Sequence, residues 1–588
     1  MKLNRQMAFF VFVLVLTLAG CSTSRETVDR KNTENIKNTE NTENTENAQS
    51  TTTAPSTAAT QVEESPPIFP AVKTRPETAL EIQKMPSRPR NEMTSPQPMA
   101  LAGRVMMEDH SLFIAPPPPW NRESYNAVSE NGFISTGNNP LSTFSIDVDT
   151  ASYSNIRRFI GQGTLPPVGA VRIEEMINYF SYNYPQPDTN NPFSVTTELG
   201  PCPWNGEHEL VRIGLKARDI NKKDLPPSNL VFLIDVSGSM SAPNKLPLLK
   251  QSLKMLVQQL DKNDRVSMVV YAGMDFVLLE PTAGSEQKKI LAAIDMLGAG
   301  GATHASSGII TAYKLAEQVF MPKGNNRIIL ASDGDFNVGT TSRGELRKLI
   351  EEKRKTGIYL TVLGFGMGNY HDDTMEILAD KGNGNYAYID NLLEAKKVMV
   401  KEMSGTMFAL AGDVKIQVEF NPAMVGAYRL IGYENRTLAD EDFNNDAKDA
   451  GEIGVGHTVT ALYELIPAGS DDLPRIDPLK YQQVRKKSGV QYNNELMTVK
   501  LRYKPLHQQK SHLLTTTVKR KNIELAATSN DFRFAAAVAG FGMLLQDSDL
   551  RGDLDYDRVL TLAKNAKGID DEGYRAEFIR LVEMSQLL

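Results

Sequence analysis

The chain has 588 residues, more than one domain usually contains, so we expect several folded parts. Apolar residues make up 41% and charged residues 23%, a balance typical of packed domains. The formal net charge is -7, which argues against nucleic acid as a partner, because such partners need a clustered basic surface. There are two cysteines, Cys21 and Cys202. If Cys21 is modified, Cys202 has no partner for an intramolecular disulfide, and we expect a packed, inert thiol.

The first twenty residues have the pattern of a signal peptide. Lys2 and Arg5 precede an almost unbroken apolar run over residues 7–20. This run is shorter than the ~20 apolar residues that a membrane-spanning helix needs. It ends in Leu-Ala-Gly-Cys at 18–21, which resembles the lipobox of bacterial lipoproteins. The resemblance implies cleavage before Cys21 and a lipid on its thiol. An ordinary secreted protein with an unmodified cysteine is the alternative.

The residues after the cysteine predict an anchored tether. Ser22 resembles the sorting position of lipoproteins that Gram-negative cells pass to the outer membrane. We therefore expect a lipid-anchored protein of the cell envelope, in the outer membrane if the cell is Gram-negative. The following stretch lacks apolar periodicity and repeats Asn-Thr-Glu at 32–34, 38–40, 41–43 and 44–46. Such composition cannot bury enough surface to fold, so residues 21–138 are predicted to be a lipidated, disordered tether.

Folded character begins near residue 141. Residues 143–149 alternate polar and apolar side chains, as a half-buried strand does. Short helices are predicted at 156–161 and 171–180, and strands at 195–199 and 209–216. These elements indicate an N-terminal α+β module over residues 139–227.

Buried strands then alternate with amphipathic helices over residues 228–411. The predicted strands are 230–235, 265–271, 327–331, 359–364 and 385–389. The predicted helices are 246–260, 286–297, 306–320, 345–355, 373–380 and 393–406. This alternation predicts a Rossmann-like α/β domain with a doubly wound, mostly parallel sheet.

The pattern changes again beyond residue 411. Strands are predicted at 414–420, 428–433, 457–465 and 495–503, and helices at 531–545, 556–567 and 571–585. Residues 412–588 are therefore expected to form a β-rich domain with a helical end.

Oxygen-bearing side chains follow the predicted central strands of the α/β domain. The strand 230–235 runs into Asp235, Ser237 and Ser239 in an Asp-x-Ser-x-Ser motif. A Gly-Gly-Ala-Thr loop presents Thr303, and Asp333 follows the strand 327–331. Open α/β sheets bind ligands beyond the carboxyl ends of their strands, and hard divalent cations prefer oxygen ligands. The sequence therefore predicts a site for Mg²⁺, with Mn²⁺ or Ca²⁺ possible.

These three loops, in this order, resemble the metal-ion-dependent adhesion site of von Willebrand factor A domains. The resemblance implies that Ser237 and Ser239 bind the ion directly, and that Thr303 binds directly or through water. Asp235 and Asp333 would act through water, leaving a position open for a partner's carboxylate. A vestigial site is the alternative. Residues 141–588 as a whole resemble bacterial lipoproteins of the YfbK type, which carry Thr-Phe-Ser-Ile-Asp-Val-Asp-Thr, here at 143–150.

We accordingly expect a non-catalytic lipoprotein, facing the surface or periplasm, that binds a protein partner through an Asp or Glu side chain. The membrane is contacted through the lipid on Cys21. Nucleotide binding is not expected, because no phosphate-binding Gly-x-x-x-x-Gly-Lys-Ser/Thr motif is present. A metal-dependent hydrolase is an alternative, although no nucleophile or base accompanies the site. An accessory subunit of a larger assembly is another, although the signal peptide argues against a cytoplasmic ATPase as its partner.

Overall fold

The computed structural model describes residues 122–188, 191–301, 305–334, 343–474, 494–506, 508 and 510–588. The predicted signal peptide, the lipidation site Cys21 and the first part of the predicted tether lie outside these residues. So does Thr303. No helix among the described residues is long and apolar enough to cross a membrane.

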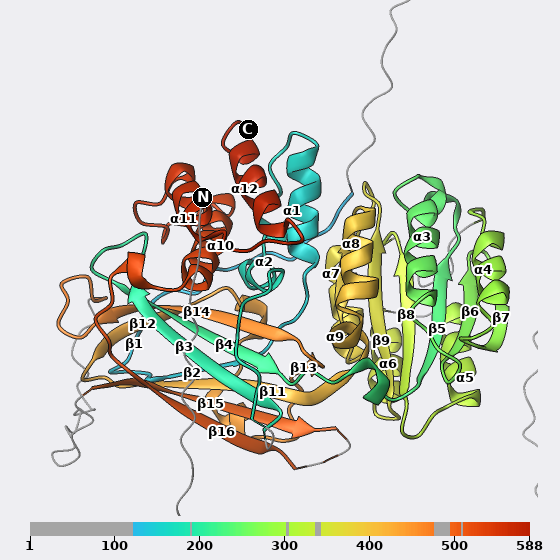
Figure 1. Cartoon of the computed structure of the whole chain (residues 1–588), viewed down its shortest axis with the longest axis horizontal. Coiled ribbons are helices and arrows are strands. Elements are labelled where there is room, and N and C mark those ends of the chain that lie inside the picture. The colour runs from blue at the N-terminus through green and yellow to red at the C-terminus, as the bar shows by residue number, and fades with distance from the viewer. Residues whose placement is uncertain are drawn as a thin grey trace, which may run out of the picture. The chain divides into compact units, whose positions relative to one another are not determined.

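The α/β domain has one six-stranded sheet in the order β10-β9-β8-β5-β6-β7 (Figure 1). Its strands are β5 (Ser228–Asp235), β6 (Arg265–Tyr271), β7 (Asp275–Ala283), β8 (Asn325–Ser332), β9 (Ile358–Phe365) and β10 (Tyr386–Ile389). Every neighbouring pair is parallel except β6 and β7. The prediction of a mostly parallel, doubly wound sheet is confirmed, but the antiparallel edge strand β7 was not predicted.

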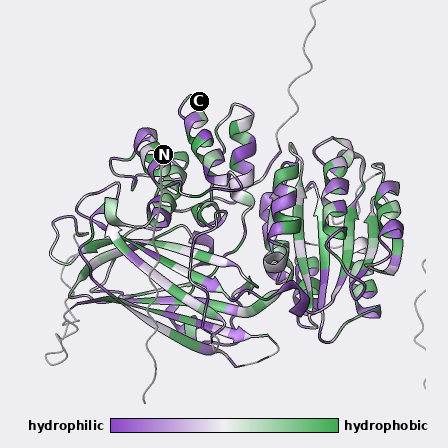
Figure 2. Ribbon diagram, in the orientation of Figure 1, coloured by the Kyte–Doolittle hydropathy of each residue, from purple (hydrophilic) through white to green (hydrophobic). Residues whose placement is uncertain are grey.

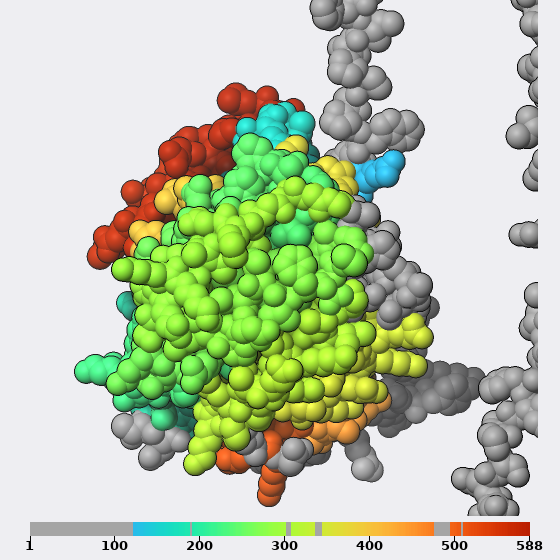
Figure 3. All heavy atoms as spheres, turned by 90° about the vertical axis from the view of Figure 1, so that its right-hand side faces the viewer, coloured from blue at the N-terminus to red at the C-terminus, as the bar shows by residue number. Residues whose placement is uncertain are grey.

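Helices cover both faces of this sheet. They are α3 (Leu246–Val257), α4 (Gln287–Met296), α5 (Ala305–Gln318), α6 (Arg343–Arg354), α7 (Asp372–Lys381) and α8 (Leu392–Lys396). One core joins α3, α4 and α8 to the sheet, and a second core joins α5, α6 and α7 to its other face. The hydropathy colouring in Figure 2 follows this pattern, with apolar strands between helices of mixed character. The edge strand β7, with α4 and α5, faces the viewer in Figure 3.

The last helix of the domain is not continuous. The sequence predicts one helix over 393–406, but α8 is followed by a π-helical turn, Lys397–Lys401, and by a separate helix α9 (Met403–Met407). Asn391 caps α8 by accepting hydrogen bonds from the backbone N–H groups of Leu393 and Glu394. Such a π turn inserts an extra residue into the helix and re-aims the side chains beyond it.

The chain on either side of this domain forms two antiparallel sheets. Their strands are β1 (Ile134–Ser135), β2 (Leu141–Ser145), β3 (Phe193–Pro201), β4 (Glu209–Ala217), β11 (Ala409–Phe420), β12 (Val425–Ile431), β13 (Gly451–Gly454), β14 (Thr458–Pro467), β15 (Glu495–Pro505) and β16 (His512–Lys519). One sheet has the order β1-β12-β14-β4-β3, and the other has β13-β11-β15-β16 with β2 on β11. Their inner faces share one core.

This pairing corrects the predicted division into consecutive flanking modules, 139–227 and 412–588. Strand β4 pairs with β14, and β2 pairs with β11, so both sheets combine strands from the two sides of the α/β domain. The physical reason is that isolated two-stranded ribbons are only marginally stable, whereas joined sheets bury a common apolar face. The α/β domain is thus inserted between two halves of one β-sandwich.

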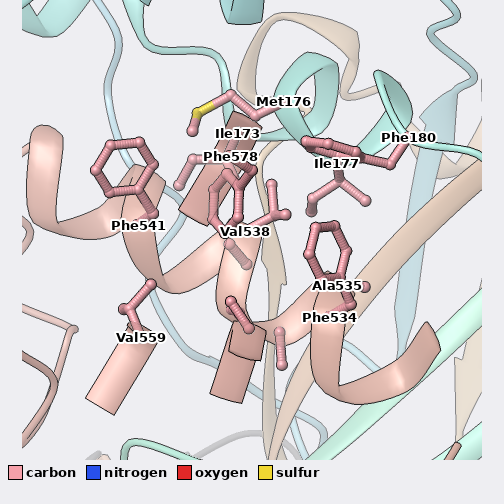
Figure 4. Close-up of a cluster of buried hydrophobic side chains, with 14 of the residues drawn as sticks. Ile173, Met176, Ile177, Phe180, Phe534, Ala535, Val538, Phe541, Val559 and Phe578 are labelled. Atoms are coloured by element: carbon pink, nitrogen blue, oxygen red, sulfur yellow. The ribbon is translucent and has the colours of Figure 1, made fainter. Parts of the chain in front are cut away.

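Five helices pack on the outer side of this sandwich. They are α1 (Ala151–Gly161), α2 (Ile173–Asn178), α10 (Asn530–Leu545), α11 (Tyr556–Ala566) and α12 (Tyr574–Ser585). Figure 4 shows their core, where Ile173 and Phe180 from the N-terminal half meet Phe534 and Phe578 from the C-terminal half. Cys202 is buried in the same core. The helical end is therefore not a cap on the C-terminal strands alone.

The predicted tether also ends earlier than residue 138. The backbone N–H of Arg122 donates to the oxygen of Gly368 at 2.7 Å, and Ser124 bridges to His371. Glu123 pairs with the guanidinium of Arg158 at 2.8 Å. This segment has no apolar periodicity, which explains the wrong prediction, because backbone hydrogen bonds and a buried ion pair hold it instead.

Buried and half-buried ion pairs connect the α/β domain to its flanks. Arg172, just before α2, binds Asp372 of α7 at 2.5 Å and also Glu175. Arg436, from the C-terminal half, binds Asp147 at 3.0 Å and Asp380 of α7 at 2.7 Å. We refer to the ion pairs of Arg172 and Arg436 as the junction network. Removing one partner of a buried pair leaves an uncompensated charge, so this network fixes α7 against both flanks.

Candidate metal centre

The loop after β5 brings two hydroxyls together above a buried carboxylate. Asp235 is the last residue of β5, and its Oδ1 accepts a hydrogen bond from the backbone N–H of Ser237 at 2.9 Å. A 3₁₀ turn, Gly238–Ser241, follows and folds the chain back, so that the hydroxyls of Ser237 and Ser239 lie 3.0 Å apart. Asp235 and Ser237 are buried, whereas Ser239 is partly exposed. The site is therefore accessible from the side of Ser239.

The glycine loop lies directly against the serine loop. The N–H of Gly300 donates to the oxygen of Val236 at 2.7 Å, and the N–H of Gly238 donates to the oxygen of Gly301 at 3.1 Å. Gly301 has a φ of 89°, a conformation that side chains other than glycine rarely adopt. Two backbone hydrogen bonds thus join the beginning of the predicted Thr303 loop to the serines. The role of Thr303 itself stays a prediction.

The third loop begins where β8 ends. The hydroxyl of Ser332 donates to Oδ2 of Asp235 at 3.1 Å and accepts the N–H of Gly334 at 3.1 Å. Asp333 is fully buried and accepts a hydrogen bond from Nζ of Lys245 at 2.7 Å. Because β5 and β8 are parallel neighbours, their ends bring Asp235 and Asp333 to one edge of the sheet.

The electrostatics of this edge favour a cation. The pKa of Asp235 is raised to about 6: burial and the nearby charge of Asp333 raise it, and hydrogen bonds from Ser237 and Ser332 partly offset this effect. A nearby positive ion stabilises the charged form of such a carboxylate. Two carboxylates and two hydroxyls form an all-oxygen set, which suits Mg²⁺ or another hard cation. The donor set therefore fits the predicted ion.

The charged side chains alone would not make a metal site. Among the described residues, no three His, Cys, Asp or Glu side chains are grouped so that they could hold an ion. A site built only from such groups, as for zinc, is thus not present in that part of the chain. At the edge of the sheet, hydroxyls must supply the remaining oxygen ligands.

Three residues of this centre were not predicted from the sequence: Ser332, Lys245 and Asn369. Ser332 orients Asp235, and Lys245 contacts both Asp333 and the amide oxygen of Asn369, the latter at 3.5 Å. Ser332 stands in the Ser-Asp-Gly motif and could have been found there. Lys245 and Asp333 are 88 residues apart in the chain, and only the folded sheet brings them together.

Comparison with known protein families agrees with the fold of the α/β domain. The family model of the von Willebrand factor type A domain matches residues 229–401. A model described as the C-terminal region of uncharacterized protein YfbK matches residues 405–588, and one described as von Willebrand factor matches residues 119–212. The fold and the matched model together define a protein with a von Willebrand factor A domain, called the A domain below.

The chain belongs to the YfbK family. It is 43% identical over 468 residues to the protein described as uncharacterized protein YfbK of Escherichia coli (strain K12), covering 78% of this chain and 80% of that protein. A more distant relative is the magnesium-chelatase 67 kDa subunit of Chlorobaculum tepidum, 27% identical over 34% of this chain and 36% of that protein. Among solved structures, a von Willebrand factor type A protein from Catenulispora acidiphila has 15% identity and a TM-score of 0.36, covering 65% of this chain and 88% of that one.

Proposed function

We propose that this protein is a non-catalytic binding protein of the cell envelope. Its A domain binds a divalent cation, Mg²⁺ or else Mn²⁺ or Ca²⁺, and the ion binds an Asp or Glu side chain of a partner protein. The observation that carries the proposal is the convergence of the Ser237 and Ser239 hydroxyls, 3.0 Å apart, beside the buried Asp235. Von Willebrand factor A domains commonly mediate protein–protein interaction, which supports the same reading.

Each residue of the centre has a distinct part in this proposal. Ser237 and Ser239 would bind the ion directly, and Thr303 directly or through water. Asp235 and Asp333 would supply charge and hold ligand water, because both already accept hydrogen bonds within the protein. When bound, the ion supplies an electrophilic position for an anionic ligand. Mg²⁺ usually takes about six oxygen ligands at about 2.0–2.1 Å, which leaves room for a partner's carboxylate.

The hydrogen bonding of the carboxylates favours binding over hydrolysis. A general base must reach the proton that it removes from a nucleophile. Asp235 accepts hydrogen bonds from Ser237 and Ser332, and Asp333 accepts one from Lys245. Both carboxylates of the centre are therefore already hydrogen-bonded within the protein. A metal-dependent hydrolase remains the second candidate, and metal-dependent cleavage of a nitrophenyl ester or phosphate would support it.

Anchoring at the membrane is a further part of the proposal. The motif at 18–21 supports a lipid on Cys21, and with it an anchor in the cell envelope, in the outer membrane if the cell is Gram-negative. In cells that express the protein, a Cys21→Ser variant is expected to move from the membrane fraction to the soluble fraction. Retention of that variant in membranes would contradict the lipid anchor.

Calorimetric titration of the full chain with Mg²⁺ tests the metal site. Wild type is expected to bind one ion, and Ser237→Ala to lose most of the affinity. Ser585→Ala is the matched control, because its buried hydroxyl donates to the backbone oxygen of Leu581 within α12. Equal titrations of all three proteins would contradict the assignment.

Partner binding needs a separate test. A partner is accepted only if its capture needs the ion, fails with Ser237→Ala, and fails when one acidic residue of the partner is neutralised.

A further inference from the structure

A lysine ammonium lies inside the proposed metal centre. Lys245 precedes α3 and is only 6% exposed, which is unusual for a charged side chain. Its Nζ donates to Oδ2 of Asp333 at 2.7 Å, and Asp333 is fully buried. The amide oxygen of Asn369 lies 3.5 Å from the same nitrogen. One of the two predicted metal-site carboxylates is thus already paired with a cation of the chain.

The lysine stem packs closely against a glycine, which leaves room for it. A Cβ atom built on Gly366 would lie 2.2 Å from Cε of Lys245 and 2.5 Å from its Cγ, so any other residue at this position would displace the side chain. Gly366 has a φ of 80°, and its carbonyl oxygen accepts a hydrogen bond from the hydroxyl of Tyr388. Gly366 and Asn369 belong to one loop after β9. This loop therefore fixes the ammonium beside Asp333.

We propose that Lys245 sets the metal affinity of this centre by opposing the divalent ion. The inference rests on the proposed metal site and deepens it. Asp235 and Asp333 carry two negative charges, and the ammonium cancels one of them. A divalent ion that enters the site is repelled by Lys245 at short range, where the effective dielectric constant is low. Once loaded, the centre has a net positive charge, and this charge favours an anionic ligand from a partner.

A purely structural role of Lys245 predicts the opposite change in metal affinity when the lysine is removed. If Lys245 serves only to hold the Asp333 loop, then its removal frees a carboxylate that holds ligand water and weakens metal binding. If Lys245 opposes the ion, then its neutral replacement strengthens metal binding, even though the buried pair is lost. The sign of the change in Mg²⁺ affinity therefore separates the two roles.

The test is a calorimetric titration of the full chain with Mg²⁺ alone, in chloride buffer at about pH 8. It compares wild type, Lys245→Met and Lys245→Gln. Methionine keeps the length of the stem without its charge, and glutamine keeps a polar end. Lys254→Met is the matched control, because Lys254 lies on the same helix α3 and pairs with the exposed Asp295. Circular dichroism and the thermal midpoint without metal show whether each variant is folded.

Both neutral variants at position 245 are expected to bind Mg²⁺ about 10-fold or more tightly than wild type does. Lys254→Met is expected to match wild type. Unchanged or weaker binding by a folded variant at position 245, beside a wild type that binds, would overturn the role of Lys245 and leave the metal site standing. Absence of binding by wild type and all folded variants would overturn the proposed metal site, and this inference with it.

Discussion

The metal centre and the junction network both bury carboxylates, but they balance the charge differently. In the junction network, Arg172 and Arg436 each contact two or more acidic side chains. The Arg172 side chain is buried, and that of Arg436 is 12% exposed. At the metal centre, Asp235 accepts hydrogen bonds from the Ser332 hydroxyl and the backbone N–H of Ser237, whose own hydroxyl lies 3.0 Å from that of Ser239. The ammonium of Lys245 donates to Asp333. Acidic groups that are ion-paired with arginine hold parts of the fold together. Acidic groups surrounded by hydroxyls are suited to an incoming cation.

This difference explains how one chain can use the same residue type for two tasks. An arginine presents several fixed donors and cannot be displaced by a metal ion without losing a buried pair. A serine hydroxyl can instead turn its oxygen toward an ion. The two regions should therefore respond differently to loss of charge. At the junction network the stability of the fold should change, whereas at the metal centre the affinity for the ion should change.

The largest expected effect is at the junction network. Arg172→Met should lower the free energy of unfolding by about 3–5 kcal/mol, because Asp372 and Glu175 lose their buried partner. Denaturant unfolding followed by circular dichroism measures this change. A loss below about 1 kcal/mol would mean that the junction carboxylates do not depend on arginine, and the contrast with the metal centre would fail.

Neutralising a carboxylate at the metal centre should have a different outcome. Asp235→Asn is expected to weaken Mg²⁺ binding about 100-fold, equivalent to about 2.7 kcal/mol. Burial disfavours the charge of Asp235, so the metal-free variant should be as stable as wild type or more stable at pH 8. Calorimetry gives the affinity and denaturant unfolding gives the stability. A large loss of metal-free stability would show that Asp235 is a structural residue like those of the junction.

The pH dependence of stability tests Glu434, a half-buried carboxylate that belongs to neither region. Burial raises the pKa of Glu434 to about 7, and the charge of Glu130 contributes, while Arg429 lowers it. The folded state then holds the proton more tightly than the unfolded state between about pH 4.5 and 7, so stability falls as the pH rises through this range. In Glu434→Gln this fall should be smaller by on the order of 1 kcal/mol. Unfolding curves at pH 5 and pH 8 measure the difference, and identical slopes would contradict it.

The smallest effect is expected at an exposed ion pair. Arg551 pairs with Asp547 on the surface, where the aspartate side chain is 86% exposed. Arg551→Met should change the free energy of unfolding by about 0.5 kcal/mol or less. It is the control for Arg172→Met, since both substitutions remove one arginine. A loss comparable to that of Arg172→Met would show that burial does not set the value of these pairs.

The A-domain fold and most of its centre could be predicted because their signals are local. Asp235, Ser237 and Ser239 lie at the end of one strand and in the loop that follows it, and the Ser-Asp-Gly motif lies at the end of β8 in the same way. The Gly-Gly motif instead lies between α4 and α5, where glycines indicate a tight loop before a helix. The centre then needs only the rule that parallel strands end at one edge. The break in the last helix at Lys397–Lys401 has no such marker, because its apolar spacing continues through the π turn.

The remaining features depend on contacts between distant parts of the chain. Lys245 reads as an ordinary residue before a helix until β8 places Asp333 beside it. Strand β4 was predicted correctly, but its partner β14 follows the whole A domain. No pattern in either strand predicts that the two pair. Glu123 lies in a stretch without periodicity and is ordered by Arg158 and the loop at Gly368. Periodicity predicts elements, and it does not predict which distant elements pair.

The most direct test of the proposed metal centre is a crystal structure of the protein grown with Mn²⁺, using the anomalous signal of the ion to place it. We predict one anomalous peak in contact with the hydroxyl oxygens of Ser237 and Ser239, at about 2.0–2.3 Å, with Asp235 and Asp333 reaching it through water. The hydroxyl of Thr303 should lie close to the same peak. Crystals soaked in millimolar Mn²⁺ that show no peak at this edge of the sheet, or show a peak only elsewhere, would contradict the account.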